Sequence, residues 1–224
     1  MIIVNTPHNP TGTVLEYEDM VQLKKLVRDT DIVILSDEVY EHILFDGRKH
    51  ESVLKHPELA ERSFVIYSFG KTYHNTGWKM GYAIAPAELT KEFRRVHQFV
   101  VFSCNTPYQH AFADVMDDKD MYLSLPQFYQ EKRDFFCKLL RDTPFTFTPA
   151  EGSYFQLVNY ANITDEPDKD YAIRLTKDIG VASVPISVFY HEGLDMKQLR
   201  FCFAKNNETL ERAVERLVKL KVTA

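Results

Sequence analysis

Three short apolar runs, each followed by a polar cluster, constrain the fold of this chain most. The runs cover residues 2–5, 32–35 and 64–67, and short apolar runs bounded by turn residues are typical of buried strands. A helical pattern over residues 17–29 separates the first two runs. Because strand–helix–strand connections within one sheet are right-handed, these two strands are predicted to be parallel. The carboxyl ends of parallel strands meet at one edge of a sheet, where ligands bind.

A fourth apolar run, residues 80–85, follows the third after an interval of about a dozen residues, which is the bare minimum for a crossover helix. The interval carries Lys71 and Gly77 and has no helical pattern. We therefore predict that residues 80–85 run antiparallel to residues 64–67. This strand would return to the same sheet edge and place Lys79 near Ser68 and Lys71.

The rest of the chain reads as a mixture of helices and strands. Predicted helices cover residues 57–61, 90–101 with Thr90 as N-cap, 107–116, 126–141, 169–179 with Gly180 as C-cap, and 208–219. Predicted strands cover residues 145–148, 154–160, 181–184 and 199–204. The polar run 117–120 interrupts the apolar pattern, and we predict domains of residues 1–120 and 121–224. The second should be α+β with antiparallel pairs.

Composition limits the class of protein. Of 224 residues, 45% are hydrophobic and 26% are charged, which suits a folded domain with a sizeable core. A net charge of −5 without a basic block argues against nucleic acid as a partner. No apolar run reaches membrane-spanning length, and no signal peptide is expected at Met1. Three widely spaced cysteines, and histidines without ligand spacing, favour a reduced cytoplasmic setting and no metal site.

Candidate chemistry lies in the polar clusters that follow the strands. A lysine at the end of a buried strand, here Lys71, can act as an amine nucleophile. With Asp37, Tyr40 and Asn9, it would bring an amine, an acid, a phenol and an amide to one edge, and this set suits pyridoxal phosphate. Plainer interpretations remain open. The lysine can be a solvated loop residue, the aspartate a helix cap, and the asparagine a turn residue.

Arg200 is a further candidate in the second half. It lies within the apolar run 199–204, and period-2 alternation places it on the face opposite Leu199 and Phe201. It is either an outward-facing strand residue or an inward-facing charge that needs a partner.

Four motifs occur in a characteristic order: Pro-His-Asn-Pro-Thr-Gly at 7–12, Ser-Asp-Glu-Val-Tyr at 36–40, Ser-Phe-Gly-Lys at 68–71 with Thr-Gly-Trp-Lys at 76–79, and Leu-Arg-Phe at 199–201. This set resembles the fold-type I pyridoxal-phosphate-dependent aminotransferases of class I, and is most similar to the methionine and kynurenine (glutamine/aromatic) transaminases. The resemblance implies an α/β fold: part of a three-layer large domain, with a mostly parallel sheet and one antiparallel strand, plus a smaller α+β C-terminal domain.

The resemblance also implies a role for each candidate. Lys71 would form an imine with the cofactor and later move a proton, Asp37 would hold the pyridine nitrogen protonated, and Tyr40 and Asn9 would bond the ring hydroxyl. Ser68 and Lys79 would hold the phosphate, and Arg200, with Asn9, would bind the substrate carboxylate. The implied reaction is transfer of an amino group between a methionine-like, aromatic or glutamine-like amino acid and a 2-oxo acid, in a homodimer.

In the resembled family, a longer N-terminal part precedes the first of these motifs and carries further phosphate and ring contacts. This chain is therefore expected to correspond to a C-terminal portion, with weak cofactor binding and little activity by itself. Two alternatives stay open. One is a cysteine-conjugate β-lyase that uses the same cofactor, and the other is a non-catalytic fragment or regulatory module that keeps part of the fold.

Overall fold

The computed structural model describes residues 1–220. They divide into two compact units. The first unit comprises Met1–Pro7 and Val14–Pro126, and the second comprises His8–Thr13 and the described residues from Gln127 onward. The predicted division into domains of residues 1–120 and 121–224 stays a prediction.

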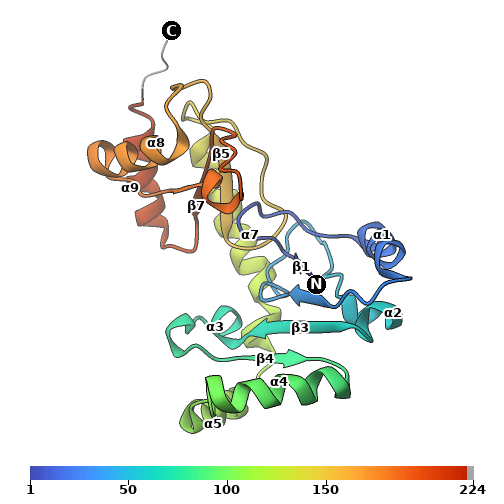
Figure 1. The fold of residues 1–224 in the computed structure, drawn as a ribbon. Helices are drawn as coiled ribbons and strands as arrows, with labels where there is room; N and C mark the ends of the chain where they lie inside the picture. The colour runs from blue at the N-terminus through green and yellow to red at the C-terminus, as the bar shows by residue number, and fades with distance from the viewer. Residues whose placement is uncertain (221–224) are drawn as a thin grey trace. The chain divides into compact units, whose positions relative to one another are not determined.

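The first unit is built on one mixed sheet (Figure 1). Its elements are β1 Ile2–Asn5, α1 Tyr17–Val27, β2 Ile34–Asp37, η1 Val53–Lys55, α2 Pro57–Ala60, β3 Ser63–Ser68, α3 Phe69–Thr72, η2 Thr76–Trp78, β4 Gly81–Ile84, α4 Ala87–Val100, α5 Thr106–Val115 and α6 Asp120–Leu123. The strand order is β1-β2-β3-β4. Strands β1, β2 and β3 are parallel and β4 is antiparallel to β3, as the sequence predicts.

One face of this sheet carries the core of the first unit. The apolar stripe of α1 buries Met20, Leu23 and Val27 against a cluster that includes Ile34 of β2 and Val65 of β3. Side chains three and four positions apart share one side of a helix, which explains why these residues of α1 face the sheet together. Burial alternates along β2 and β3, so the second face of these strands is only half-buried.

Three local predictions in this unit are wrong. Strand β2 begins and ends two residues late, so Asp37 is its last residue and does not follow it. The carbonyl of Asp37 accepts hydrogen bonds from the Asn5 side-chain amide (2.8 Å) and the Thr6 N–H (3.1 Å). These bonds join the end of β2 to the end of β1. Lys71 lies in the helical turn α3, where no helix is predicted. Thr90 is not an N-cap, since α4 begins at Ala87 and the Thr90 N–H already donates within the helix.

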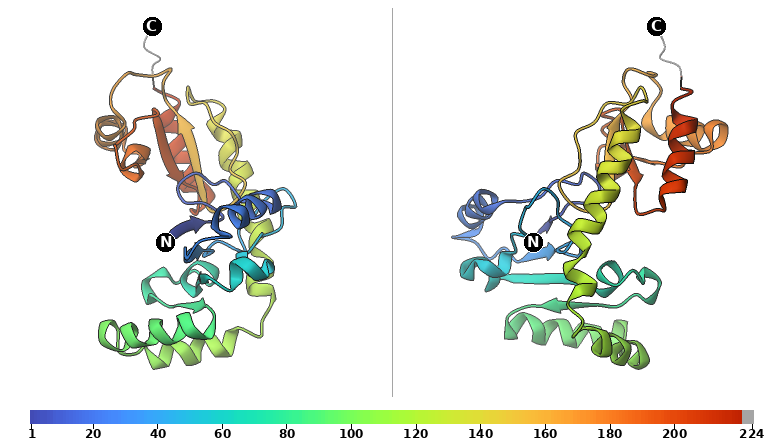
Figure 2. Two further views of the ribbon diagram at one scale, coloured as in Figure 1. Left: turned by 45° about the vertical axis from the view of Figure 1, so that its right-hand side comes forward. Right: turned by 180° about the vertical axis from the view of Figure 1, so that it is seen from behind.

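The second unit packs helices on a small antiparallel sheet. Its elements are α7 Leu125–Leu140, β5 Phe155–Asn159, α8 Asp168–Arg174, the π-helical turn η3 Leu175–Ile179, β6 Val184–Pro185, η4 Ile186–Phe189, β7 Gln198–Cys202 and α9 Asn207–Leu217. The strand order is β5-β7-β6, and both pairings are antiparallel, which confirms the α+β prediction. Figure 2 shows α7 and α9 running along this sheet. Leu199 and Phe201 of β7 are buried, and Phe201 packs edge to face on Phe136 of α7.

Two strand predictions in this unit are only partly right. The predicted strand 145–148 is reduced to a single bridge between Thr146 and Asn159. Proline flanks this segment at both ends and cannot donate to a strand ladder, so pairing does not extend. The predicted strand 181–184 forms only as β6. Gly180 does end the preceding helical segment, with a φ of +75°, which confirms the predicted C-cap.

No helix within residues 1–220 combines the length and apolar character needed to cross a bilayer.

Candidate active site

The predicted sheet edge exists in the first unit. Asp37 ends β2 and pairs with Ile66, two residues before the end of β3, while Ser68 ends β3 and pairs with Gly81 at the start of β4. The half-buried face of β2 carries Asp37, and the half-buried face of β3 carries Ser68. Residues paired in register project from the same side of a sheet. The carboxylate and the hydroxyl therefore leave the same face near the edge where ligands bind in α/β sheets.

Lys71 and Tyr40 meet at this edge. Helical turn α3 follows β3 directly and holds Lys71 half-buried, with its Nζ 5.6 Å from the centroid of the Tyr40 ring. Tyr40 itself is buried. Gly70 makes this turn possible, because a Cβ there would lie 2.9 Å from the Cα of Thr76. The sequence predicts this amine–phenol proximity, and the structure brings the two groups together.

The environment of Asp37 makes its negative charge unfavourable unless a cation lies nearby. Burial raises the pKa of Asp37, and the N–H of Val39, which donates to Oδ1 at 3.3 Å, and the charge of Lys71 both oppose that rise. The neighbouring Glu38 charge adds to it. The net pKa is raised, so a positive group beside this carboxylate would relieve an unfavourable burial.

Lys79 reaches the edge in the way the strand order predicts. It adopts left-handed backbone geometry, with a φ of +56°, at the end of η2 and two residues before Gly81. Its side chain is exposed. The return of β4 to the end of β3 is thus confirmed, while a phosphate-binding role for Lys79 stays a prediction.

Asn9 and Arg200 form a pair within the second unit. The Arg200 guanidinium donates to Asn9 Oδ1, and its Cζ lies 3.9 Å from the centroid of the Phe155 ring. Phe189 stacks more loosely, at 5.6 Å. Arg200 does lie on the face of β7 opposite Leu199 and Phe201, so its side chain is held by a ring and an amide on that face. The direct hydrogen bond between Arg200 and Asn9 was not predicted.

The turn that carries Asn9 is held by backbone bonds. The N–H of Gly12 donates to the carbonyl of His8, and the N–H of His8 donates to the carbonyl of Thr13, both at 2.8 Å. The N–H groups of Glu151 and Gly152 then donate to the carbonyl of Gly12, both at 2.9 Å. These bonds fix the turn within the second unit and so fix the position of the asparagine amide.

Sequence reasoning missed a buried network on the opposite face of the first sheet. Glu38 is fully buried and accepts hydrogen bonds from Ser36 Oγ (2.8 Å), Tyr67 Oη (2.9 Å), the N–H of Val53 (3.1 Å) and His50 Nε2 (2.7 Å). Burial alone would raise the pKa of Glu38, but the His50 hydrogen bond and charge and nearby hydroxyls lower it overall. Ser36 and Glu38, the two neighbours of Asp37, are polar at positions whose side chains face inward. Polar residues at such positions were the sequence signal that could have indicated this network.

Glu41 is a second residue that was not predicted. Its side chain is 11% exposed, and its Oε2 is buried without a hydrogen-bond partner within residues 1–220. Burial, with the charges of Glu38 and Asp37, raises its pKa to about 7, against the opposing hydrogen bonds from its own backbone and, more weakly, from Thr72. A carboxyl group with this pKa exchanges its proton near neutral pH.

No group of three or more metal-ligating side chains is placed to hold a metal ion in the part of the chain that the structure describes. The chemistry available at the first-unit edge is that of an amine, a carboxylate, a phenol and hydroxyls. This set agrees with the chemistry that the sequence predicts for a site that holds an aldehyde-bearing, anionic, heteroaromatic cofactor, and the assignment of these residues to it stays a prediction.

Comparison with known proteins identifies the family. Residues 1–217 match the family described as aminotransferase class I and II, and the chain belongs to that family. Class I aminotransferases use pyridoxal 5'-phosphate.

A methionine aminotransferase of Escherichia coli (strain K12) is 46% identical over 221 residues, which are 98% of this chain and 57% of the relative. Kynurenine–oxoglutarate transaminase 1 of Homo sapiens is 32% identical over 243 residues, covering 99% of this chain and 58% of the relative. The chain therefore spans a little under three fifths of the length of these relatives.

Solved structures agree with the sequence relatives. The crystal structure of an Escherichia coli methionine aminotransferase matches with a TM-score of 0.94 at 46% identity, covering 98% of this chain and 58% of that one. N-Succinyldiaminopimelate aminotransferase from Mycobacterium tuberculosis matches with a TM-score of 0.93 at 31% identity and the same coverage. The predicted fold, part of the aminotransferase large domain with the smaller C-terminal domain, is confirmed.

Proposed function

We propose that this chain provides the lysine and the carboxylate-binding arginine for pyridoxal-phosphate-dependent transfer of an amino group between an amino acid and a 2-oxo acid. The observation that carries the proposal is the placement of Lys71 beside Tyr40 and within electrostatic reach of Asp37 at the end of parallel strands. An amine to condense with the cofactor's aldehyde, an acid to accept from its ring N–H and a phenol to bond its ring oxygen are the groups that this cofactor needs.

Different residues of the first unit would hold different parts of the cofactor. Asp37, whose burial is relieved by a cation, would hold the protonated ring nitrogen, and Tyr40 would donate to the ring oxygen. Ser68 and the exposed Lys79 would hold the phosphate, Lys79 as a point charge. When bound, the cofactor supplies an aldehyde that condenses with amines and a cationic ring that withdraws electrons from the substrate α-carbon.

Lys71 would then act on the substrate itself. Its Nζ, released when the substrate amine takes its place, is the base that accepts the proton from the α-carbon. The buried Tyr40 ring lines one side of the amine, with its centroid 5.6 Å from Nζ, and helps to hold Lys71 at this edge of the sheet.

Arg200 would bind the substrate carboxylate. Its guanidinium stacks on Phe155 and donates to Asn9, so its plane is fixed before a ligand arrives. A fixed planar guanidinium can offer two parallel N–H groups to a carboxylate. Asn9 would support this role by holding the guanidinium.

The favoured amino donor is proposed to be methionine or an aromatic or glutamine-like amino acid. The support is likeness to a methionine aminotransferase and a kynurenine–oxoglutarate transaminase. We also propose that the working protein is a cytoplasmic homodimer, in agreement with three cysteines that remain free thiols in the structure.

A cofactor titration of the purified 224-residue chain tests the proposal. Visible absorbance should report a lysine-bound cofactor in the wild-type chain and in Lys25→Ala, which removes an exposed lysine of α1, but not in Lys71→Ala. We expect weak binding that needs excess cofactor, and little oxo-acid formation from methionine. Stoichiometric tight binding would refute the weak-binding part, and an unchanged absorbance band in Lys71→Ala would refute the assignment of the lysine.

A further inference from the structure

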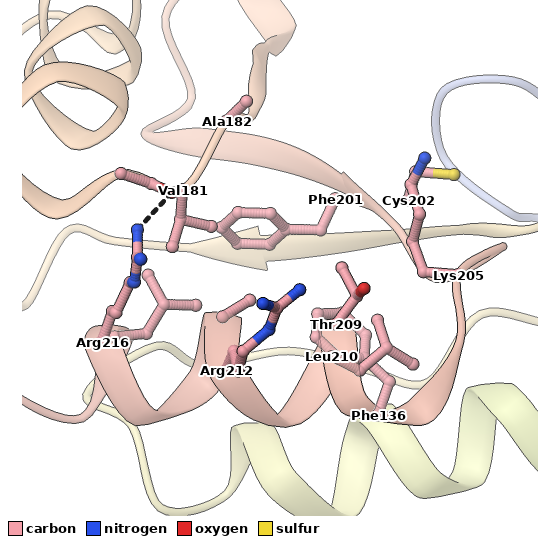
Figure 3. Close-up of a pocket in the computed structure, with 13 residues that line it drawn as sticks. Phe136, Val181, Ala182, Phe201, Cys202, Lys205, Thr209, Leu210, Arg212 and Arg216 are labelled. Carbon is pink, nitrogen blue, oxygen red and sulfur yellow. Dashed lines mark hydrogen bonds between the residues drawn. The ribbon is translucent and has the colours of Figure 1, made fainter.

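The second unit contains a cavity that the proposed reaction does not use. Its volume is about 510 Å³, and none of its lining residues belongs to the predicted site. It lies between α9 and β7, and Figure 3 shows the Phe201 ring above α9. Buried apolar side chains form its floor: Phe136, Val181, Phe201, Leu210 and Leu217. A volume of this size and an apolar floor are typical of small-molecule sites.

Cationic side chains surround this apolar floor. Arg212 and Lys205 are both exposed and line the cavity. Neither has an ion-pair partner within residues 1–220, although acidic residues alternate with the cations along α9. Thr209, half-buried one helical turn before Arg212, adds a hydroxyl. Arg212 and Lys205 thus form a positively charged lip at the mouth of the cavity. The chain as a whole has a net charge of −5, so this positive charge is a local feature.

A third cation is fixed at one end of the cavity. Arg216 Nη1 donates to the carbonyl of Gly180 at 3.1 Å and to that of Ile179 at 3.5 Å, as Figure 3 shows in part. Gly180 is required for this contact, because a Cβ there would lie 2.2 Å from Nη1. The guanidinium is thus held by backbone carbonyls at the wall, and no ion pair joins it to a carboxylate within residues 1–220.

We propose that this cavity binds a small organic carboxylate with an apolar body. The apolar body would cover the buried floor, while the carboxylate would take charge-assisted hydrogen bonds from Arg212 and Lys205 at the lip. Apolar contact alone would not select an acid, and the two unpaired cations provide that selection. The site is separate from the proposed transamination, because none of its lining residues is among those assigned to the cofactor or the substrate.

The test uses 4-phenylbutyrate as probe and the whole 224-residue chain. Binding is followed by isothermal titration and by amide chemical shifts of α9 and β7. Arg212→Gln and Lys205→Gln should each weaken binding by about tenfold, as expected for loss of one charge-assisted hydrogen bond. Lys169→Gln, which removes an exposed cation of α8 outside the cavity, should leave binding unchanged.

Three further arms locate the probe. The neutral analogue 4-phenylbutan-1-ol cannot make either charge-assisted hydrogen bond, so it should bind the wild-type chain about a hundredfold more weakly than the acid does. In Arg212→Gln, where only the Lys205 bond remains, the acid should keep an advantage of about tenfold. Ala182→Phe, which adds a ring at an exposed lining position, should abolish binding. Arg200→Gln should leave it intact.

The outcomes decide the proposal in either direction. No binding of the acid at millimolar concentration, equal binding of acid and alcohol, or full binding by Ala182→Phe would each overturn it. Loss of binding in Arg200→Gln would assign the probe to the predicted substrate site and would overturn it as well. Circular dichroism of each variant, all changed at exposed positions except Arg200→Gln, identifies any variant that has failed to fold.

Discussion

Replacing Glu41 with glutamine is expected to make the stability of the first unit less dependent on pH. The side chain is 11% exposed, and its Oε2 lacks a hydrogen-bond partner within the described residues. Burial first, and then the charges of Glu38 and Asp37, raise its pKa from the usual 4.5 to about 7. Ionising this carboxyl group therefore costs more in the folded chain than in the unfolded chain.

The direction follows from proton linkage. Between pH 4.5 and about pH 7 the folded state binds a proton at Glu41 that the unfolded state has already released. The stabilisation that comes from protonated Glu41 is therefore fully present below the pKa of the unfolded state, and it is lost as the pH rises through the pKa of the folded state. A shift of this size corresponds to roughly 3 kcal/mol across the window.

The assay is urea unfolding followed by far-ultraviolet circular dichroism at several pH values. Glu41→Gln should approach wild-type stability near the acid end and exceed it by up to about 3 kcal/mol near pH 8. Glu61→Gln, at an exposed position at the end of α2, is the matched control and should keep the wild-type slope. If Glu41→Gln keeps the wild-type slope as well, Glu41 does not titrate near neutral pH and the reasoning fails.

Substitutions at three further positions test buried hydrogen bonds, backbone geometry and packing. Glu38→Ala should lower the free energy of unfolding by about 3–5 kcal/mol, because it leaves buried donors of Ser36 and Tyr67 unpaired, and Glu38→Gln should cost less than half as much; urea unfolding checks both. Gly180→Ala should cost about 1–2 kcal/mol in thermal unfolding, because φ is +75° and the added Cβ would lie 2.2 Å from Nη1 of Arg216, which must move. Leu199→Ala, at a fully buried position, should cost about 2–5 kcal/mol in the same measurement.

The sequence pattern predicted the sheet of the first unit because its strands and their directions depend on short segments and on the intervals between them. Apolar runs identify β1, β2 and β3, and the short interval before β4 excludes a crossover helix, so strand directions follow. The same reasoning brings Asp37, Ser68 and Lys71 to one edge. It placed β2 two residues early, because apolarity alone does not show where ladder bonds begin.

Contacts between distant segments could not be predicted in this way. Asn9 and Arg200 are 191 positions apart, and although the resemblance implies that both bind the substrate carboxylate, neither motif indicates their direct hydrogen bond. His50 joins Glu38 from an irregular loop whose path the sequence pattern does not encode. The interactions that orient the candidate groups therefore emerge only from the tertiary structure, even where the groups themselves are evident from sequence.

Borohydride trapping of the cofactor on the 224-residue chain tests the central claim most directly. Reduction fixes a cofactor bound to a lysine amine, and peptide mass spectrometry then locates the added mass. The account predicts the added mass on Lys71, reduced in Asp37→Asn and Tyr40→Phe and absent in Lys71→Ala. Labelling spread over exposed lysines, or labelling of Lys71 that is unaffected by Asp37→Asn and Tyr40→Phe, would contradict it.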